Sequence, residues 1–341
     1  MTTIPGVDND LSTMMHAVFA KHAATGEGSA GTPSAALWRN LTELGLSRLT
    51  GSAESGGSAA GWLEAAELLS AAAGAGVHIP LAEHDLLAGA LLEAASLPVD
   101  DRLRTVAELD TAGVARAVPW ASTAASIVTL WRCGDSWLIA DVDTSAIGQI
   151  IHGTNLVGEP RDRVTADTGA LRGAAIDDTL VEQYHLKSAL ARAIQVSAAL
   201  DRAMMLSCEH ATARTQFGRP LARFQAVQNL IADMAGECAL ARAATEAALA
   251  AAVRSEWSSD DLGFRVAVAR SCAGHATTTV VRNAHQVHGA IGTALSHNLH
   301  RFTRAALAWR GEFGSVGYWD RRLAAAAAAA GPGGLWELIA S

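Results

Sequence analysis

Residues 213–243 read ARTQFGRPLARFQAVQNLIADMAGECALARA and join two long stretches of helical pattern. Gly218 and Pro220 interrupt this pattern, because glycine adopts the conformations that terminate helices and proline cannot continue one. Pro220 also suits the first turn of the helix that follows. The stretch therefore marks a joint between two helices, and this joint is unusually rich in polar and aromatic side chains.

The joint has the chemistry of an anion site. Arg214, Gln216 and Gln225 are expected around a helix N-terminus, where the first backbone N–H groups have no partner within the helix. A cation beside free N–H donors suits a phosphate or a pyrophosphate. Arg214 could instead pair with a neighbouring carboxylate, and the residue types alone leave both alternatives open.

The composition favours a mainly α fold. Half of the 341 residues are hydrophobic, but only 5% are aromatic, and alanine supplies much of the apolar share. Alanine has the highest helix propensity and is poor in strands. The formal net charge of −8 creates no global basic field, so neither nucleic acid nor an anionic membrane surface is an expected partner.

Cysteine usage and the first residues indicate a soluble cytoplasmic protein. The four cysteines lie far apart and form no CxxC pair, which is typical of free thiols in a reducing compartment. The opening residues MTTIPGVDND have neither the basic nor the apolar region of a signal peptide. No apolar run reaches the length of a membrane span.

Three regions follow one another along the chain. Residues 1–115 are predicted to form an N-terminal helical domain with Gly, Ser and Pro between its helices. Residues 116–182 are predicted to form a small β domain, in which the runs 125–133 and 136–143, joined by Gly-Asp, indicate a hairpin. Residues 183–341 are predicted to form a C-terminal four-helix bundle.

The helices expected in the bundle are long. Helices of about 30 residues exceed the usual globular length, and antiparallel packing in a bundle explains them. We expect helices at about 184–214, 219–254, 258–289, 295–309 and 315–330.

Two segments carry a resemblance to a known family. The string RTQFGRPLARFQAVQNLIADM resembles the acyl-CoA dehydrogenase signature R-x-Q-F-G-x-x-[IL]-x-x-[FH]-Q-x-x-x-x-x-[IL]-A-[DE]-M. The segment HQVHGAIGTALSHNLHRFTRAA is similar to the family's Q-x-x-G-G-x-G and the helix that follows it. LWRNLTELGL and IPLAEH also look like the family's first helical domain. The resemblance implies an acyl-CoA dehydrogenase-like fold with a reduced β domain.

The resemblance also implies an FAD site. In this family the bundle is the core of a tetramer, and both motifs reach the pyrophosphate and adenine end of a neighbour's FAD. Ala290 stands where the family usually has glycine. Carried over residue by residue, the cofactor-binding residues are Arg214, Gln216, Phe217, Gln225, Gln286, Val287, His288 and Gly289.

The flavin-ring half of the family site is not recognisable. In family members a T-E-P-x-x-G-S-D loop marks this half of the site. Residues 115–131 read ARAVPWASTAASIVTLW and contain neither T-E-P nor G-S-D. Ser122 and Thr123 could hydrogen-bond a flavin, or they are ordinary hydroxyls at a strand edge.

The chain also departs from the family at the catalytic base. The family's reaction removes an α-proton from an acyl-CoA thioester while hydride leaves the β-carbon for flavin, so it needs a carboxylate base. One family position for this glutamate falls at Phe313, with Glu312 one residue earlier as the candidate base. The other falls at about Ser188, where no carboxylate occurs. We expect no catalytic base in this chain, with Glu312 as the alternative.

The histidines near the second motif are not expected to bind metal. Their spacing resembles that of metal ligands, but no carboxylate or cysteine completes a set, which favours ordinary polar histidines. The residues concerned are His285, His288, His297 and His300.

An adenine-side half site without a base is expected of a subunit that completes another chain's active site. The chain resembles the short subunit of actinobacterial α2β2 acyl-CoA dehydrogenases that act on steroid side-chain CoA thioesters. The resemblance implies a larger homologous partner that carries the glutamate, and an electron-transfer flavoprotein as electron acceptor. The alternatives are a self-sufficient homotetrameric dehydrogenase that uses Glu312, and a non-catalytic scaffold subunit.

Overall fold

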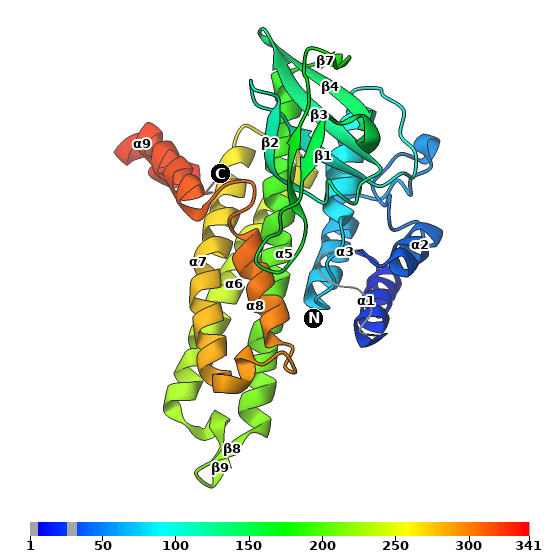
Figure 1. Cartoon of the computed structure of the whole chain (residues 1–341). Helices are drawn as coiled ribbons and strands as arrows, with labels where there is room; N and C mark the ends of the chain where they lie inside the picture. The colour runs from blue at the N-terminus through cyan, green and yellow to red at the C-terminus, as the bar shows by residue number, and fades with distance from the viewer. Residues whose placement is uncertain (1–5, 26–32, 341) are drawn as a thin grey trace. The chain divides into compact units, whose positions relative to one another are not determined.

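The computed structural model describes residues 6–25 and 33–340, and its chain divides into two compact units, residues 1–188 and 189–341. The architecture is mainly α with a small β region (Figure 1), as the sequence predicts. None of the helices in the described ranges combines the length and the apolar character that crossing a membrane requires.

The helices of the first unit match the apolar runs of the sequence. Ser34 begins the second of them, where its hydroxyl accepts a hydrogen bond from the backbone N–H of Leu37 at 3.2 Å. Leu37 and Leu41 are buried on its inner face. The helical elements are α1 (Asn9–Thr25), α2 (Ala35–Glu43), α3 (Trp62–Gly74), the π-helix η2 (Ala82–Gly89) and α4 (Ala90–Ala94).

The β region consists of two sheets with strand orders β1-β3-β4-β7 and β2-β6-β5. The predicted hairpin is confirmed: β3 pairs antiparallel with β4 from Ser126↔Asp143 to Cys133↔Ser136. Ile127 and Trp131 lie in its apolar core. The strands are β1 (Arg104–Glu108), β2 (Val114–Pro119), β3 (Ser126–Cys133), β4 (Ser136–Asp143), β5 (Gln149–Ile151), β6 (Arg161–Thr165) and β7 (Ala174–Ile176).

Strands begin earlier than the sequence predicts. β1 lies wholly before residue 116, and β1 pairs parallel with β3. This strand is short, and its residues Thr105 and Val106 are the only β-branched ones in it, so it shows little pattern of its own. Its pairing with β3 stabilises it, which is a tertiary effect. The division at 115 and 182 stays a prediction.

The second unit contains the bundle. Figure 1 shows its helices running alongside one another, with a short hairpin at one end. Alanines on the inner faces, such as Ala241, Ala267 and Ala276, are fully buried and permit close helix approach. The elements are the C-terminal part of α5 (Asp178–Ala213), β8 (Thr215–Gln216), β9 (Arg219–Pro220), η4 (Leu221–Arg223), α6 (Gln225–Arg254), α7 (Leu262–His288), η5 (Gly289–Thr293), α8 (Leu299–Trp309) and α9 (Val316–Ala340).

The joint between α5 and α6 differs from the prediction. Pro220 lies in strand β9 rather than in the first turn of a helix, and α6 begins at Gln225. Phe217 and Gly218 have φ values of 50° and 78° and form the two-residue turn of a β-hairpin. Two consecutive residues with positive φ are the requirement of a type I′ turn. The polar joint is therefore a projecting hairpin.

The last predicted helix ends where expected. α9 is interrupted at Gly331, whose φ of 65° is outside the helical region, and Pro332 follows it. The Gly-Pro pair thus separates the alanine-rich segment from a further helical segment.

His84 makes the first unit sensitive to acid. Its ring is 2% exposed, and Nδ1 accepts a hydrogen bond from the backbone N–H of Arg104 at 3.1 Å. Burial, with the nearby charges of Arg104 and Arg48, lowers the pKa of His84 from 6.5 to about 3. The folded state thus favours the neutral ring. The stability that the neutral ring contributes is fully present above pH 6.5 and is lost as the pH falls toward 3, because the unfolded chain binds the proton first.

We expect His84→Gln to reduce this acid sensitivity, because glutamine keeps an acceptor but does not titrate. The native chain should lose up to about 2 kcal/mol more unfolding free energy than the variant between pH 7 and pH 5. Urea denaturation at the two pH values measures this. His152→Gln, at an exposed ring, should leave the loss undiminished. Equal losses in native chain and His84→Gln would contradict the assignment.

Candidate functional site

The hairpin presents Arg214 to solvent. Arg214 directly follows α5, and its side chain is exposed. With the Gln216 amide turned so that its oxygen faces the guanidinium, that oxygen accepts hydrogen bonds from Nη2 at 2.7 Å and Nε at 3.2 Å. The amide thus orients the guanidinium while leaving other N–H donors available. Among the described residues, the side-chain partner of Arg214 is the Gln216 amide and not a carboxylate.

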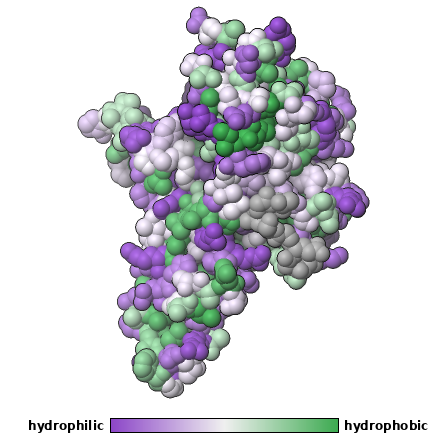
Figure 2. Space-filling model, viewed as in Figure 1, coloured by the Kyte–Doolittle hydropathy of each residue, from purple (hydrophilic) through white to green (hydrophobic). Residues whose placement is uncertain are grey.

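An aromatic side chain projects from the hairpin turn. Phe217 is 91% exposed, and its ring meets that of Phe224 edge-on at 6.3 Å between centroids. The Arg219 guanidinium lies 4.2 Å from the centre of the Phe224 ring. Figure 2 shows hydrophobic and hydrophilic residues mixed at this end of the bundle. An exposed aromatic face beside arginines is a surface on which a planar base can stack.

The N-terminus of α6 adds backbone donors. Phe224 occupies the N-cap position, and no side chain of the described residues caps the helix there. Gln225 begins the helix, and its Nε2 donates to Oδ1 of Asn229 at 3.3 Å, with both residues exposed. The uncapped N–H groups of the first turn attract an anion.

The second predicted segment forms the end of α7. Gln286 is exposed, whereas Val287 and His288 are each only 5% exposed. Of these three residues, only Gln286 therefore presents its side chain at the surface. Gly289 has a φ of 62°, and a Cβ added there would meet no atom within 4 Å. The surface at Gly289 is open, as close approach of a ligand to the backbone requires.

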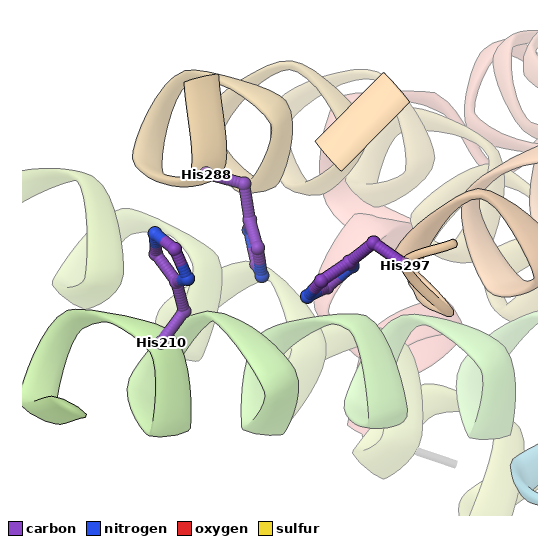
Figure 3. A group of neighbouring side chains, drawn as sticks. All are labelled: His210, His288 and His297. Atoms are coloured by element: carbon purple, nitrogen blue, oxygen red, sulfur yellow. The ribbon is translucent and has the colours of Figure 1, made fainter. Parts of the chain in front are cut away.

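Three histidines lie close together inside the second unit, in an arrangement that the sequence pattern does not predict (Figure 3). His288 of α7 lies between His210 of α5 and His297, which precedes α8. The centroid of the His288 ring lies 4.5 Å from that of the His210 ring and 4.8 Å from that of the His297 ring. His210 was missed because it is far from the others in sequence, and only the helix packing brings it near.

The other two histidines of the predicted spacing are engaged elsewhere. Nε2 of His285 is hydrogen-bonded to Oγ1 of Thr303 at 3.0 Å, and Nδ1 of His300 donates to the carbonyl of His297 at 2.7 Å. Burial lowers the pKa of His288 to about 4 and also lowers the pKa of His210. Both rings are thus neutral at physiological pH.

Glu312 lies in a buried ion pair. Its Oε2 is 2.7 Å from Nε of Arg192, whose side chain is 2% exposed. Phe313, at the position where the family motif predicts a base, has its ring 5.3 Å from the Arg192 guanidinium carbon. The loop after α8 is thus tied to α5 through one arginine, and its carboxylate already has a cationic partner.

A second buried arginine holds the same loop. Nη2 of Arg270 donates to the backbone carbonyls of Arg310, Glu312 and Gly314 at 3.0, 2.7 and 3.2 Å. Burial, together with the positive charge of Arg192, lowers the pKa of Arg270 to about 9, so it remains a cation at neutral pH. Its charge stabilises carbonyl groups that no helix satisfies.

The remaining predicted positions make local contacts. The fully buried Ser188 hydroxyl donates to the carbonyl of Tyr184 at 2.7 Å. The Thr123 hydroxyl donates to the carbonyl of Trp120 at 3.0 Å, within a turn. The backbone N–H of Ser122 donates to Asp162 at 2.7 Å. The Thr123 contact is that of an ordinary hydroxyl within a turn.

The first unit has an open groove of about 650 Å³ beside β4 and β7, lined in part by charged residues. Nη2 of Arg104 lies 2.7 Å from Asp100 and 3.0 Å from Asp141, and Nε of Arg102 lies 2.9 Å from Asp100. The guanidinium groups of Arg102 and Arg104 thus already pair with carboxylates, and Arg172, which also lines the groove, donates to the backbone carbonyl of Leu171 at 3.2 Å.

Sequence comparison identifies the C-terminal part of the chain. Residues 186–327 match the family described as acyl-CoA dehydrogenase, C-terminal domain. Acyl-CoA dehydrogenase FadE34 of Mycobacterium tuberculosis is 35% identical over 116 residues, which cover 34% of this chain and 16% of FadE34. Acyl-CoA dehydrogenase IpdE2 of the same organism is 33% identical over 117 residues, or 34% of each chain. The matches thus span at most about a third of these two relatives.

Structural similarity extends over nearly the whole chain. A chain of the ChsE4–ChsE5 complex from Mycobacterium tuberculosis superposes with a TM-score of 0.80 at 21% identity, over 93% of this chain and 95% of that one. A chain of a Tcur3481–Tcur3483 steroid ACAD variant gives 0.80 at 22% identity, over 93% and 96%. Residues 186–327 therefore belong to the acyl-CoA dehydrogenase C-terminal domain family, and the chain as a whole has the acyl-CoA dehydrogenase fold.

Proposed function

We propose that this chain is the short subunit of a heterotetrameric, FAD-dependent acyl-CoA dehydrogenase. The assembly would introduce a double bond between the α- and β-carbons of a CoA thioester. One observation carries the proposal: an exposed Arg214–Gln216 pair is ready to hold a pyrophosphate, while neither family position for the base has a free carboxylate. Half a cofactor site without a base suits a chain that completes a partner's active site.

The residues present fit the adenine side of FAD. The Arg214 guanidinium and the uncapped N-terminus of α6 would hold the pyrophosphate, since both attract anions. The exposed Phe217 ring would stack on the adenine, and Gly289 would allow the cofactor to approach the backbone. When bound, FAD supplies the hydride acceptor of the reaction. The chain itself binds and orients one end of the cofactor.

Proton abstraction is assigned to the partner. At one base position Phe313 packs against Arg192, and at the other the Ser188 hydroxyl is bound to a backbone carbonyl. Neither residue can accept an α-proton. We infer a larger homologous subunit that carries a base glutamate and the T-E-P-x-x-G-S-D loop. Removal of the α-proton by that glutamate would accompany hydride loss from the β-carbon.

The substrate and setting are inferred from the structural relatives. Two of them come from two-component assemblies, and one of these is described as a steroid ACAD. We infer an acyl group derived from a steroid side chain, an electron-transfer flavoprotein as acceptor, and a cytoplasmic location. The three-domain division, with the bundle as the centre of oligomerisation and of FAD-adenine binding, belongs to the same proposal.

Replacing Arg214 tests the shared site. In the complex co-expressed with the larger subunit, Arg214→Ala should weaken FAD binding about 10- to 100-fold, because a charge-assisted hydrogen bond contributes about 1.5–3 kcal/mol. FAD released on denaturation and the FAD dissociation constant measure this. The control is Arg223→Ala, an exposed arginine nearby in η4. Unchanged flavin content in Arg214→Ala would favour the scaffold alternative.

Glu312→Gln separates a structural role from a catalytic one. Removing the negative charge breaks the ion pair with the buried Arg192, which should lower the unfolding free energy by about 1–3 kcal/mol. Turnover of the complex at a permissive temperature should stay within about threefold, whereas loss of a general base costs about 10²- to 10⁴-fold. Glu337→Gln, at an exposed site, serves as control. A 100-fold loss of kcat at unchanged stability would instead identify Glu312 as the base, as the homotetrameric alternative requires.

A further inference from the structure

We propose that His210, His288 and His297 bind a divalent transition-metal ion, for which Zn²⁺ is the best match. The proposal is independent of the acyl-CoA dehydrogenase function. It rests on the proximity of three imidazoles from separate segments and on one buried ring nitrogen that has no hydrogen-bond partner among the described residues.

The three rings lie close together. One ligand nitrogen from each histidine lies within 4.8 Å of the other two. The rings of His210 and His288 stack at an interplanar angle of 24°, and the ring of His297 meets that of His288 at 67°. Figure 3 shows His288 extending between the other two side chains. The residues come from α5, from the end of α7 and from the loop before α8, so three segments would be linked by one ion.

His288 is oriented as a metal ligand. Its Nδ1 donates a hydrogen bond to the carbonyl of Ala284 at 2.8 Å, which fixes the tautomer and leaves a lone pair on Nε2. A backbone carbonyl in this role is typical of metal-binding histidines. The residue is 5% exposed, and its Nε2 is buried without a hydrogen-bond partner among the described residues. A buried acceptor left unpaired costs about 1–3 kcal/mol, which a bound ion would remove.

The other two rings can move to complete the site. Zn–N bonds of about 2.0–2.1 Å place tetrahedral ligand nitrogens about 3.4 Å apart, so the present triangle must contract. His210 is half-exposed, and His297 lies in the loop between η5 and α8. Nδ1 of His297 now accepts from the backbone N–H of Leu299 at 3.1 Å. Ligation through Nε2 requires a proton on Nδ1, so that contact must open when metal binds.

The ligand set selects the class of ion. Neutral imidazoles suit Zn²⁺, Cu²⁺, Ni²⁺ and Co²⁺, whereas Mg²⁺ and Ca²⁺ require oxygen ligands. Three histidines leave a fourth position for water, as in open zinc sites. His210 lies one helical turn before Arg214, and His288 directly precedes Gly289. A bound ion would therefore link the helix end that leads to Arg214 with the helix end that leads to Gly289.

Metal titration tests the proposal. The full-length chain, in the form in which it purifies, is treated with a chelator, dialysed, and titrated with Zn²⁺ by calorimetry and with Co²⁺ by visible absorption. We expect one ion per chain, a micromolar or lower dissociation constant, the absorption of four-coordinate Co²⁺, and a rise in the thermal midpoint with Zn²⁺. Mg²⁺ should produce none of these changes.

Variants locate the site. His288→Gln and His210→Gln should each weaken Zn²⁺ binding at least 100-fold, and circular dichroism checks that they are folded. The half-exposed His210 is included because the buried position could disturb folding. His275→Gln is the matched control, because it lies on the same helix α7 and outside the cluster. A native chain with no Zn²⁺ binding below millimolar concentration overturns the proposal, and so does binding that both cluster variants retain.

Discussion

The guanidinium of Arg270, buried in the bundle, is the constraint on which the functional interpretation depends. Its Nη2 binds three backbone carbonyls of the turn between α8 and α9, and Arg192 binds the carboxylate of Glu312 in the same turn. Two buried cations thus fix the segment in which the family motif places a base. Here that segment contributes to the interior of the bundle, and its carboxylate neutralises a charge that burial would otherwise make costly.

The hairpin between α5 and α6 is exposed, in contrast to the buried segment after α8. Phe217 is 91% exposed at a turn with positive φ, and the neighbouring Arg214 is oriented by an amide rather than neutralised by a carboxylate. Apolar and cationic groups left exposed in this way are typical of a surface that a partner or a ligand covers. An occupied base position and an exposed hairpin both support the proposed division of labour between two chains.

Sequence patterns predicted much of the fold, and the residues show why the rest escaped. Long alanine-rich runs gave the bundle helices, and Gly-Asp between β-branched runs gave the hairpin of β3 and β4. β1 was missed because its partner strand stabilises it. The turn at Phe217 was missed because a phenylalanine with positive φ has no sequence signal. His210 joined the histidine cluster only through helix packing, and the pairing of Glu312 with Arg192 likewise crosses the bundle.

The flavin content and activity of the chain expressed alone test the central claim most directly. If this chain supplies one end of a shared cofactor site, the purified chain should be colourless, should bind no stoichiometric FAD, and should not dehydrogenate acyl-CoA thioesters. Addition of the larger homologous subunit should restore both flavin and activity. A yellow homotetramer that is active without a partner would contradict the account.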